Sequence, residues 1–297
     1  MELSGILAPV LTPFRDDGSV DEAALAREVD FTIEECHADA VEAAAVETQE
    51  YHYLSHEARR ALIRTTARLV KGRRPLIVGV THPDVKAAAE LCHLAEDLGA
   101  AAAQALIPLR PFGGEPSTGE VLRYFETLGR GTSLPLVAYC NPGPGANAPV
   151  PMMVALAKLE CVQYFKESSR DLRRVGRLIE EIDRAGHARF FTTAEMLLIT
   201  LMLGGPGATT PPPAVKIAAE LLRCFRAGDL KAAAEHQRKF TLFPARWIHH
   251  GMCPVMKAAM RLAGVDVGDP HPPFEPLTAQ EVAELREYLH GIGLTAR

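Results

Sequence analysis

The stretch Leu134–Ser168 (LPLVAYCNPGPGANAPVPMMVALAKLECVQYFKES) contains a short apolar run, a longer segment and a second short run. The runs Leu134–Cys140 and Val162–Ser168 have the length and composition of buried strands. The segment Pro151–Leu159 between them is predicted to be a helix. A strand, a helix and a second strand in this order predict parallel strands joined by a crossover helix.

The same alternation extends in both directions from this stretch. Six further apolar runs lie at Gly5–Leu11, Ala40–Val46, Pro75–Val80, Ala101–Pro108, Arg189–Thr193 and Gly204–Thr210. Amphipathic segments between the runs are predicted to be helices, at Asp21–Cys36, Ser55–Val70, Asp84–Leu98, Glu120–Leu128, Leu172–Ala185 and Glu195–Leu203. Eight such units predict an α/β fold, a (β/α)8 TIM barrel. A doubly wound sheet is the alternative, but no glycine-rich phosphate fingerprint follows the first run.

The pattern changes after Pro211-Pro212-Pro213, where strand signals end. Four further segments are predicted to be helical, at Ala214–Ala227, Leu230–Phe243, Met252–Ala263 and Ala279–His290. We therefore expect a barrel over residues 1–225, carrying the active site, and a C-terminal helical extension over residues 226–297.

Composition excludes several classes of protein. The 297 residues contain 32 Lys and Arg against 37 Asp and Glu, without a basic tail, so no nucleic acid partner is expected. Apolar stretches end before the ~18 residues of a membrane helix, and Met1–Gly5 has no basic region typical of a signal peptide. Six cysteines without a CxxC pair indicate reduced thiols and a cytoplasmic location. His249–His250 is the only histidine pair, and neighbours on a helix do not easily face one ion, so no metal site is expected.

Among the eight lysines, only Lys166 falls inside a predicted strand, whereas Lys216 and Lys257 fall in predicted helices with a face open to solvent. Burial disfavours the ammonium form, and a neutral amine can attack a ketone to form a Schiff base. Alternatively, Lys166 pairs with Glu167 or with a carboxylate on a neighbouring strand.

Tyr139 ends the run before that of Lys166, and adjacent parallel strands lie ~4.8 Å apart. Its phenol could transfer a proton at the same cavity, or it could simply fill the core. The segment Val46–Glu50 follows the second run, where backbone N–H groups and the Thr48 hydroxyl could hold a carboxylate.

In order and spacing, these pieces resemble the dihydrodipicolinate synthase / N-acetylneuraminate lyase family of class I aldolases. The resemblance extends from about Leu3 to Leu294, through GILAPVLTPFRDDGSVD, ETQEYHYLSHEAR, PLVAYCNPGPG, YFKESSRDL and LMLGGPGATT. It implies that Lys166 is the Schiff-base lysine and Tyr139 the proton-transfer tyrosine. It also implies a 2-oxo acid substrate such as pyruvate, no metal or organic cofactor, and a homotetramer built as a dimer of dimers.

The chain departs from the family where substrate would bind. The family motif Gly-Thr-Thr-Gly-Glu corresponds to Val46–Glu50, so Glu47 replaces a threonine of the hydroxyl relay. Arg110 falls at the relay's second tyrosine, which crosses a subunit interface, and Pro144 at the arginine that binds the aldehyde's carboxylate. The resemblance implies substrate binding by Glu47, Thr48, Gln49, Arg110, Glu195 and Thr209.

These departures argue against lysine-pathway synthase activity. We expect a divergent Schiff-base-forming lyase or aldolase, with a 2-keto-3-deoxy sugar acid dehydratase or a non-catalytic metabolite-binding relative as alternatives. We also expect Glu47 and Arg110 to form a charged pair in place of the relay, unless each side chain turns to solvent.

Overall fold

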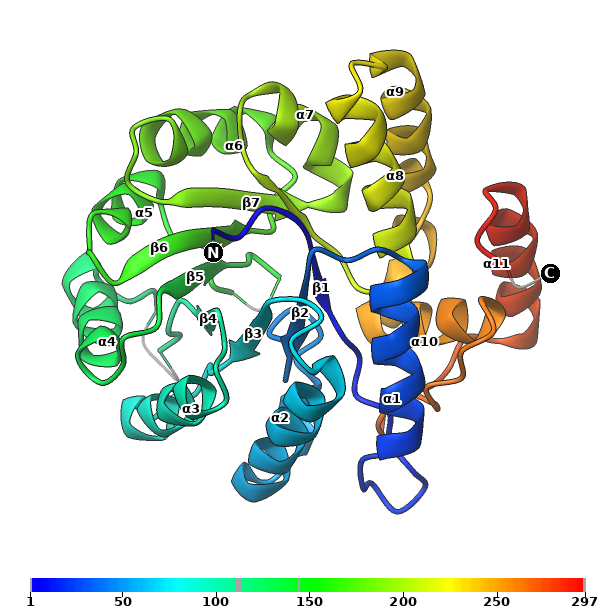
Figure 1. Cartoon of the computed structure of the whole chain (residues 1–297), viewed down its shortest axis with the longest axis horizontal. Coiled ribbons are helices and arrows are strands. Elements are labelled where there is room, and N and C mark those ends of the chain that lie inside the picture. Colours follow the sequence, from blue (N-terminus) through cyan, green and yellow to red (C-terminus); the bar gives the residue numbers. More distant parts are fainter. Residues whose placement is uncertain (1, 111–113, 144, 296–297) are drawn as a thin grey trace.

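The computed structural model describes residues 2–110, 114–143 and 145–295, and it contains a closed barrel of eight parallel strands ringed by helices (Figure 1). The strands are β1 (Gly5–Pro9), β2 (Ala40–Ala43), β3 (Leu76–Gly79), β4 (Ala102–Leu106), β5 (Leu136–Cys140), β6 (Val162–Glu167), β7 (Arg189–Thr193) and β8 (Gly207–Thr209). Each strand pairs with its neighbours in the chain, and β8 pairs with β1. The predicted barrel is confirmed, and every strand lies within its predicted run.

The helices of the eight β/α units also follow the predicted segments. They are α1 (Glu22–Asp30), α2 (His56–Val70), α3 (Val85–Asp97), α4 (Thr118–Arg130), α5 (Val150–Ala157), α6 (Leu172–Leu178), α7 (Leu197–Met202) and α8 (Ala214–Arg226). Asp21 and Ser55 accept hydrogen bonds from free N–H groups at the starts of α1 and α2. The predicted helices after β1 and β6 each end in a π-helical turn, at Phe31–Glu35 and Ile179–Asp183.

Helices α9 (Leu230–Arg238), α10 (Met252–Leu262) and α11 (Ala279–Gly291) lie on the side of the barrel nearest α8 and α1 (Figure 1). The predicted helix Leu230–Phe243 ends at Arg238, and short 3-10 turns lead to α10. One cluster of buried residues includes Ile6 of β1, Leu221 of α8 and Leu285 of α11. Because this core continues past residue 225, the boundary between barrel and extension stays a prediction. Within the described ranges, no helix is long and apolar enough to cross a membrane.

Residues two apart on a strand point to the same side of a sheet. A small buried cluster unites side chains from seven strands, β1 to β7, which can meet only inside the barrel. This interior layer contains Leu7, Ala40, Ile77, Ala102, Val137, Tyr164 and Phe191. These side chains fill the middle of the barrel, below the carboxyl ends of the strands.

Candidate active site

A polar layer lies directly beyond the apolar one. Two residues further along β2, β4, β5 and β6, the buried side chains are Glu42, Gln104, Tyr139 and Lys166. The two-residue step keeps them inside the barrel and nearer the carboxyl ends of the strands, where catalytic groups of such barrels lie. The strand register sets Tyr139 directly beside Lys166.

A cavity of ≈ 420 Å³ opens at this end of the barrel. Five of the residues expected from the sequence line it: Glu47, Tyr139, Lys166, Glu195 and Thr209. One wall comes from the C-terminal part of the chain and is apolar, with Pro244, Ala245, Ile248, Met252 and Met256. The cavity therefore combines an ionisable floor with an apolar wall.

Lys166 is 1% exposed, and its Nζ donates a hydrogen bond to the carbonyl of Thr192 at 3.1 Å. Its carboxylate neighbour is Glu47, with Oε1 4.0 Å from Nζ. Glu167, the alternative partner considered from the sequence, instead bonds Arg174 at 3.1 Å. Burial lowers the pKa of Lys166 to about 8, although the charge of Glu47 opposes this shift. Roughly a tenth of the amine is then neutral at pH 7.

The Tyr139 hydroxyl belongs to a short hydrogen-bonded chain. Asn141 Nδ2 donates to it at 2.8 Å, and Ser168 Oγ lies 2.9 Å from it. Burial raises the pKa of Tyr139 well above its ordinary value, and the charge of Glu47 raises it further. The phenol is therefore neutral at pH 7 and can donate its proton.

Glu47 turns into the barrel and is held by two neutral donors. Thr209 Oγ1 donates to Glu47 Oε1 at 3.0 Å, and Gln104 Nε2 donates to Oε2 at 3.1 Å. The same Gln104 nitrogen also donates to Glu42 Oε1 at 2.8 Å. Two buried carboxyl groups thus share one amide donor beside Lys166.

The other residues of the Val46–Glu50 segment do not reach the described cavity wall. Thr48 Oγ1 donates to the Ala45 carbonyl within its own turn, and Gln49 has a left-handed backbone with φ 55°. Glycine, which the family carries at this position, adopts such a backbone without strain. Glu50 is buried, and its Oε2 accepts a hydrogen bond from the Thr12 N–H at 2.6 Å. Its Oε1 forms an ion pair with Lys257 Nζ, at 3.0 Å.

The predicted helix suggested that Lys257 is open to solvent on one face, but the structure buries it. It is 1% exposed, because α10 packs against the barrel where Glu50 and backbone carbonyls receive its ammonium group.

Arg110 lies on the rim and bonds Glu120 Oε2 at 2.6 Å, next to the start of α4. The expected pair of Glu47 with Arg110 is thus wrong within one chain. Glu47 finds neutral donors inside the barrel, whereas Arg110 finds a carboxylate outside it. Arg110 is also not among the described residues that line the cavity. Pro144, at the position of the family's substrate arginine, lies outside the described residues.

Glu195 and Arg170 form an ion pair at the cavity mouth, with 2.9 Å between Oε1 and Nη2. Burial acts to raise the pKa of Glu195, but the charge and hydrogen bond of Arg170, together with hydrogen bonds from the backbone and Thr193, hold the pKa below its ordinary value. The cavity thus presents an Arg170 guanidinium, half exposed, beside the Lys166 amine.

The sequence analysis did not identify Glu42, Gln104, Asn141, Ser168 or Arg170. Asn141 and Ser168 stand two positions after Tyr139 and Lys166, so a two-residue repeat could have found them. A different signal could have found Glu42, because a carboxylate inside an apolar strand run is rarely buried without a partner.

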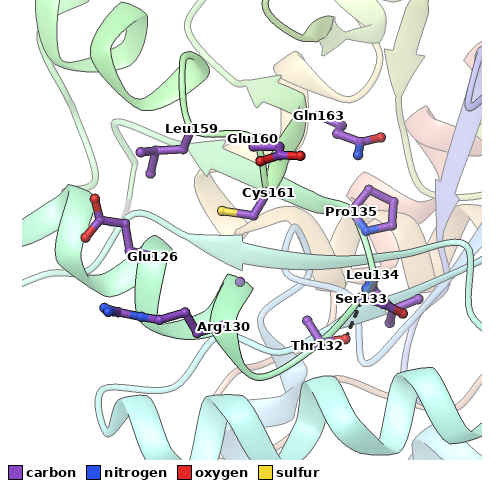
Figure 2. A pocket seen from close by; sticks show the side chains of 11 residues that line it. Glu126, Arg130, Thr132, Ser133, Leu134, Pro135, Leu159, Glu160, Cys161 and Gln163 are labelled. Carbon is purple, nitrogen blue, oxygen red and sulfur yellow. Dashed lines mark hydrogen bonds between the residues drawn. The ribbon is translucent and has the colours of Figure 1, made fainter.

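A second hollow of ≈ 610 Å³ is lined by residues from the end of α4 and from the segments that lead into β5 and β6 (Figure 2). Among them are Glu126, Arg130, Cys161 and Gln163. Gln163 precedes Lys166 on β6, so this hollow lies at the amino ends of the strands, away from the catalytic end.

His249, His250 and Glu281 have side-chain ligand atoms within 4.8 Å of one another. Neighbouring histidines on a helix were not expected to face one ion easily, yet these two direct ring nitrogens at one carboxylate. The segment Ala245–His250 is a 3-10 helix, and both Nε2 atoms reach Glu281 Oε1, at 3.3 and 2.7 Å. The other oxygen of Glu281 caps α11.

Comparison with known proteins agrees with the fold. The sequence model of the Dihydrodipicolinate synthetase family matches residues 2–292. The chain is 29% identical to 4-hydroxy-tetrahydrodipicolinate synthase from Moorella thermoacetica, over 99% of this chain and all of that protein. It is 28% identical to 4-hydroxy-tetrahydrodipicolinate synthase 1 from Halalkalibacterium halodurans, over 96% of each chain.

Among solved structures, it is similar to YagE, a prophage protein of the dihydrodipicolinic acid synthase family from E. coli K12, solved in complex with pyruvate. The TM-score is 0.90, with 25% identity over 98% of this chain and 99% of that one. The chain therefore belongs to the Dihydrodipicolinate synthetase family, as a lyase of the class I aldolase type.

Proposed function

We propose that the protein is a Schiff-base-forming lyase or aldolase that acts on pyruvate or another 2-oxo acid. Lys166 is the imine-forming nucleophile, and Tyr139 is the proton-transfer group. The observation that carries the proposal is the buried Lys166 amine, lowered in pKa to about 8 and set beside the Tyr139 phenol on the adjacent strand. An amine with this pKa is partly neutral at physiological pH and can attack a ketone.

In the proposed reaction, Lys166 adds to the ketone carbon and water is lost to give an imine. The protonated imine withdraws electrons from the adjacent bond, so that a carbon–carbon or carbon–oxygen bond beside it can break. Tyr139, neutral and held by Asn141 and Ser168, moves the proton at the substrate oxygen. Thr209 and the Arg170–Glu195 pair line the space for the rest of the substrate.

We further propose that the second substrate differs from that of the relatives named as synthases. A carboxylate, Glu47, stands where the family has a relay threonine, and the apolar wall from Pro244 to Met256 closes one side of the cavity. An aldehyde with an apolar portion fits this wall better than a small hydrophilic one.

Trapping of the imine tests the reaction. The protein incubated with pyruvate and borohydride is expected to gain the mass of one reduced pyruvyl group. Lys166→Ala is expected to abolish the gain, and so is Lys166→Arg, because guanidinium remains protonated. Lys86→Arg, at an exposed helix position, is the matched control and should be labelled like the wild type. If the wild type gains no mass with pyruvate or with a panel of 2-oxo acids, the proposal fails and a metabolite-binding role replaces it.

A homotetramer built as a dimer of dimers, located in the cytoplasm, is part of the same proposal. Its support is the family relationship, together with Arg110, which lies on the rim where the family has a residue at a subunit interface. Light scattering is expected to give about four times the 32.2 kDa chain mass. A monomer would refute the assembly but not the imine chemistry.

A further inference from the structure

Two buried carboxyl groups, Glu42 and Glu47, lie beside Lys166 in the barrel, and among the described residues one ammonium group is within ion-pair range of them. Glu42 is 1% exposed, and the Glu47 side chain is 8% exposed. Lys166 lies 4.0 Å from Glu47 Oε1 and can balance one negative charge. Two buried carboxylates beside one ammonium would leave a net negative charge in the barrel, at a high cost in desolvation.

The hydrogen bonds of the two carboxyl groups differ. Both Glu47 oxygens accept a hydrogen bond, from Thr209 and from Gln104. Glu42 Oε1 accepts two, from the Val46 N–H at 2.8 Å and from Gln104. Glu42 Oε2 is buried and accepts none from the described residues. It is therefore the oxygen that can carry a proton at the least cost.

We infer that Glu42 and Glu47 hold a single proton between them, and that Glu47 is the acid–base group for imine formation at Lys166. This inference rests on the proposed Schiff-base function. Glu42 acts through Glu47 and is a positioning residue, whereas Glu47 faces the reacting nitrogen.

The electrostatics of Glu42 support this arrangement. Burial raises the pKa of Glu42 well above its ordinary value, and the charge of Glu47 and a hydrogen bond with it raise it further. Other charged and titratable groups also face this site. Arg170 and Glu195 act on Lys166, and Tyr51 and Arg59 interact with Glu42, so a pH profile reflects all four.

Protons are conserved over the steps of imine formation. Glu47 carboxylate takes one proton from the Lys166 ammonium, and the neutral amine adds to the ketone carbon. A second proton passes from nitrogen to the substrate oxygen by way of Tyr139, giving a carbinolamine. Glu47 then returns its proton to the carbinolamine hydroxyl, water leaves, and the protonated imine forms. The 4.0 Å separation suits this role, because catalytic hydrogen bonds often tighten only with substrate bound.

The test measures the rate of pyruvate adduct formation, by borohydride quench and intact mass, from pH 5 to 9. Glu47→Gln keeps the size of the side chain but removes the base, and the rate is expected to fall about 100-fold. The apparent pKa of adduct formation is also expected to fall, because the charge that opposes desolvation of Lys166 is lost. Glu57→Gln, on a side chain 83% exposed, is the matched control and should match the wild type.

Glu42→Gln tests the shared proton, because a glutamine N–H can replace the carboxyl O–H as a donor to Glu47. The apparent pKa is expected to move by less than about half a unit. A second readout does not depend on the imine: infrared difference spectra of wild type against Glu42→Gln at pH 7 should contain a protonated carboxyl C=O band.

Separate results would overturn the role of Glu47, the shared proton and the proposed function. A Glu47→Gln rate within about three-fold of wild type would overturn the role of Glu47 as acid–base group. A large shift of apparent pKa in Glu42→Gln, or no carboxyl band, would overturn the shared proton. If Glu47→Gln does not fold, Glu47→Ala also removes the base, leaves no polar atom to pair, and should show the same loss. If the wild type forms no adduct with any 2-oxo acid, the proposed function fails, while the infrared band still tests the proton.

Discussion

Replacing Lys257 with methionine tests the buried ion pair that joins the C-terminal helices to the barrel. Lys257 Nζ lies 3.0 Å from Glu50 Oε1 and donates to the carbonyls of Thr12, at 2.7 Å, and Asp269, at 3.2 Å. Both side chains of the pair are 1% exposed. In Lys257→Met, Glu50 keeps the Thr12 N–H as a donor but loses its counter-charge.

The expected loss is large because a buried carboxylate is left without a cation. Removing one partner of such a pair costs about 3–5 kcal/mol in unfolding free energy. Methionine fills nearly the same volume as lysine, so little of this loss comes from a cavity. Lys257→Met combined with Glu50→Gln should recover much of it, because no charge remains buried.

The loss should also depend on pH. Burial raises the pKa of Glu50, and Lys257 opposes that shift. Without Lys257 the folded pKa rises further above the unfolded value, so the folded state binds more protons and stability falls as pH rises from about 4.5. The cost of Lys257→Met is therefore greater at pH 8 than at pH 5.

Urea unfolding at both pH values measures these differences. Emission of Trp247, the only tryptophan and 2% exposed, reports on the C-terminal helices, and circular dichroism reports on the barrel. Lys86→Met, at an exposed position, is the control and should change stability by less than about 0.5 kcal/mol. A loss below about 1 kcal/mol at pH 8, or a double variant no more stable than the single one, would refute the argument.

Two further predictions concern buried titratable groups. Burial raises the pKa of Glu28 to about 8, so its contribution to stability falls as pH rises from about 4.5 towards 8. Glu28→Gln should gain stability relative to wild type across that window, by up to ~1.4 kcal/mol per pH unit in urea unfolding; a pH-independent difference would contradict the raised pKa. Tyr139→Phe should slow the exchange of pyruvate methyl protons with D2O about 100-fold by NMR, because the phenol held by Asn141 and Ser168 is lost. An unchanged exchange rate would remove Tyr139 from proton transfer.

The sequence by itself determined the barrel. Strand and helix signals depend on the spacing of apolar residues within one segment, so β5, α5 and β6 could be predicted from Leu134–Ser168 alone. The same local logic identified Lys166 as the lysine inside a strand and Tyr139 as its neighbour, because consecutive parallel strands in a barrel lie side by side.

Only the tertiary structure decided which charged groups meet. Glu47 was expected to face Arg110, but it bonds Gln104 and Thr209, from β4 and β8. Lys257 was expected at a solvent face, but the packing of α10 against the barrel carries it to Glu50. The spacing of apolar residues predicts which face of a segment is buried. It does not predict which donor from a distant segment a buried carboxylate will bond. That choice depends on closure of the barrel, which brings distant segments within hydrogen-bonding distance.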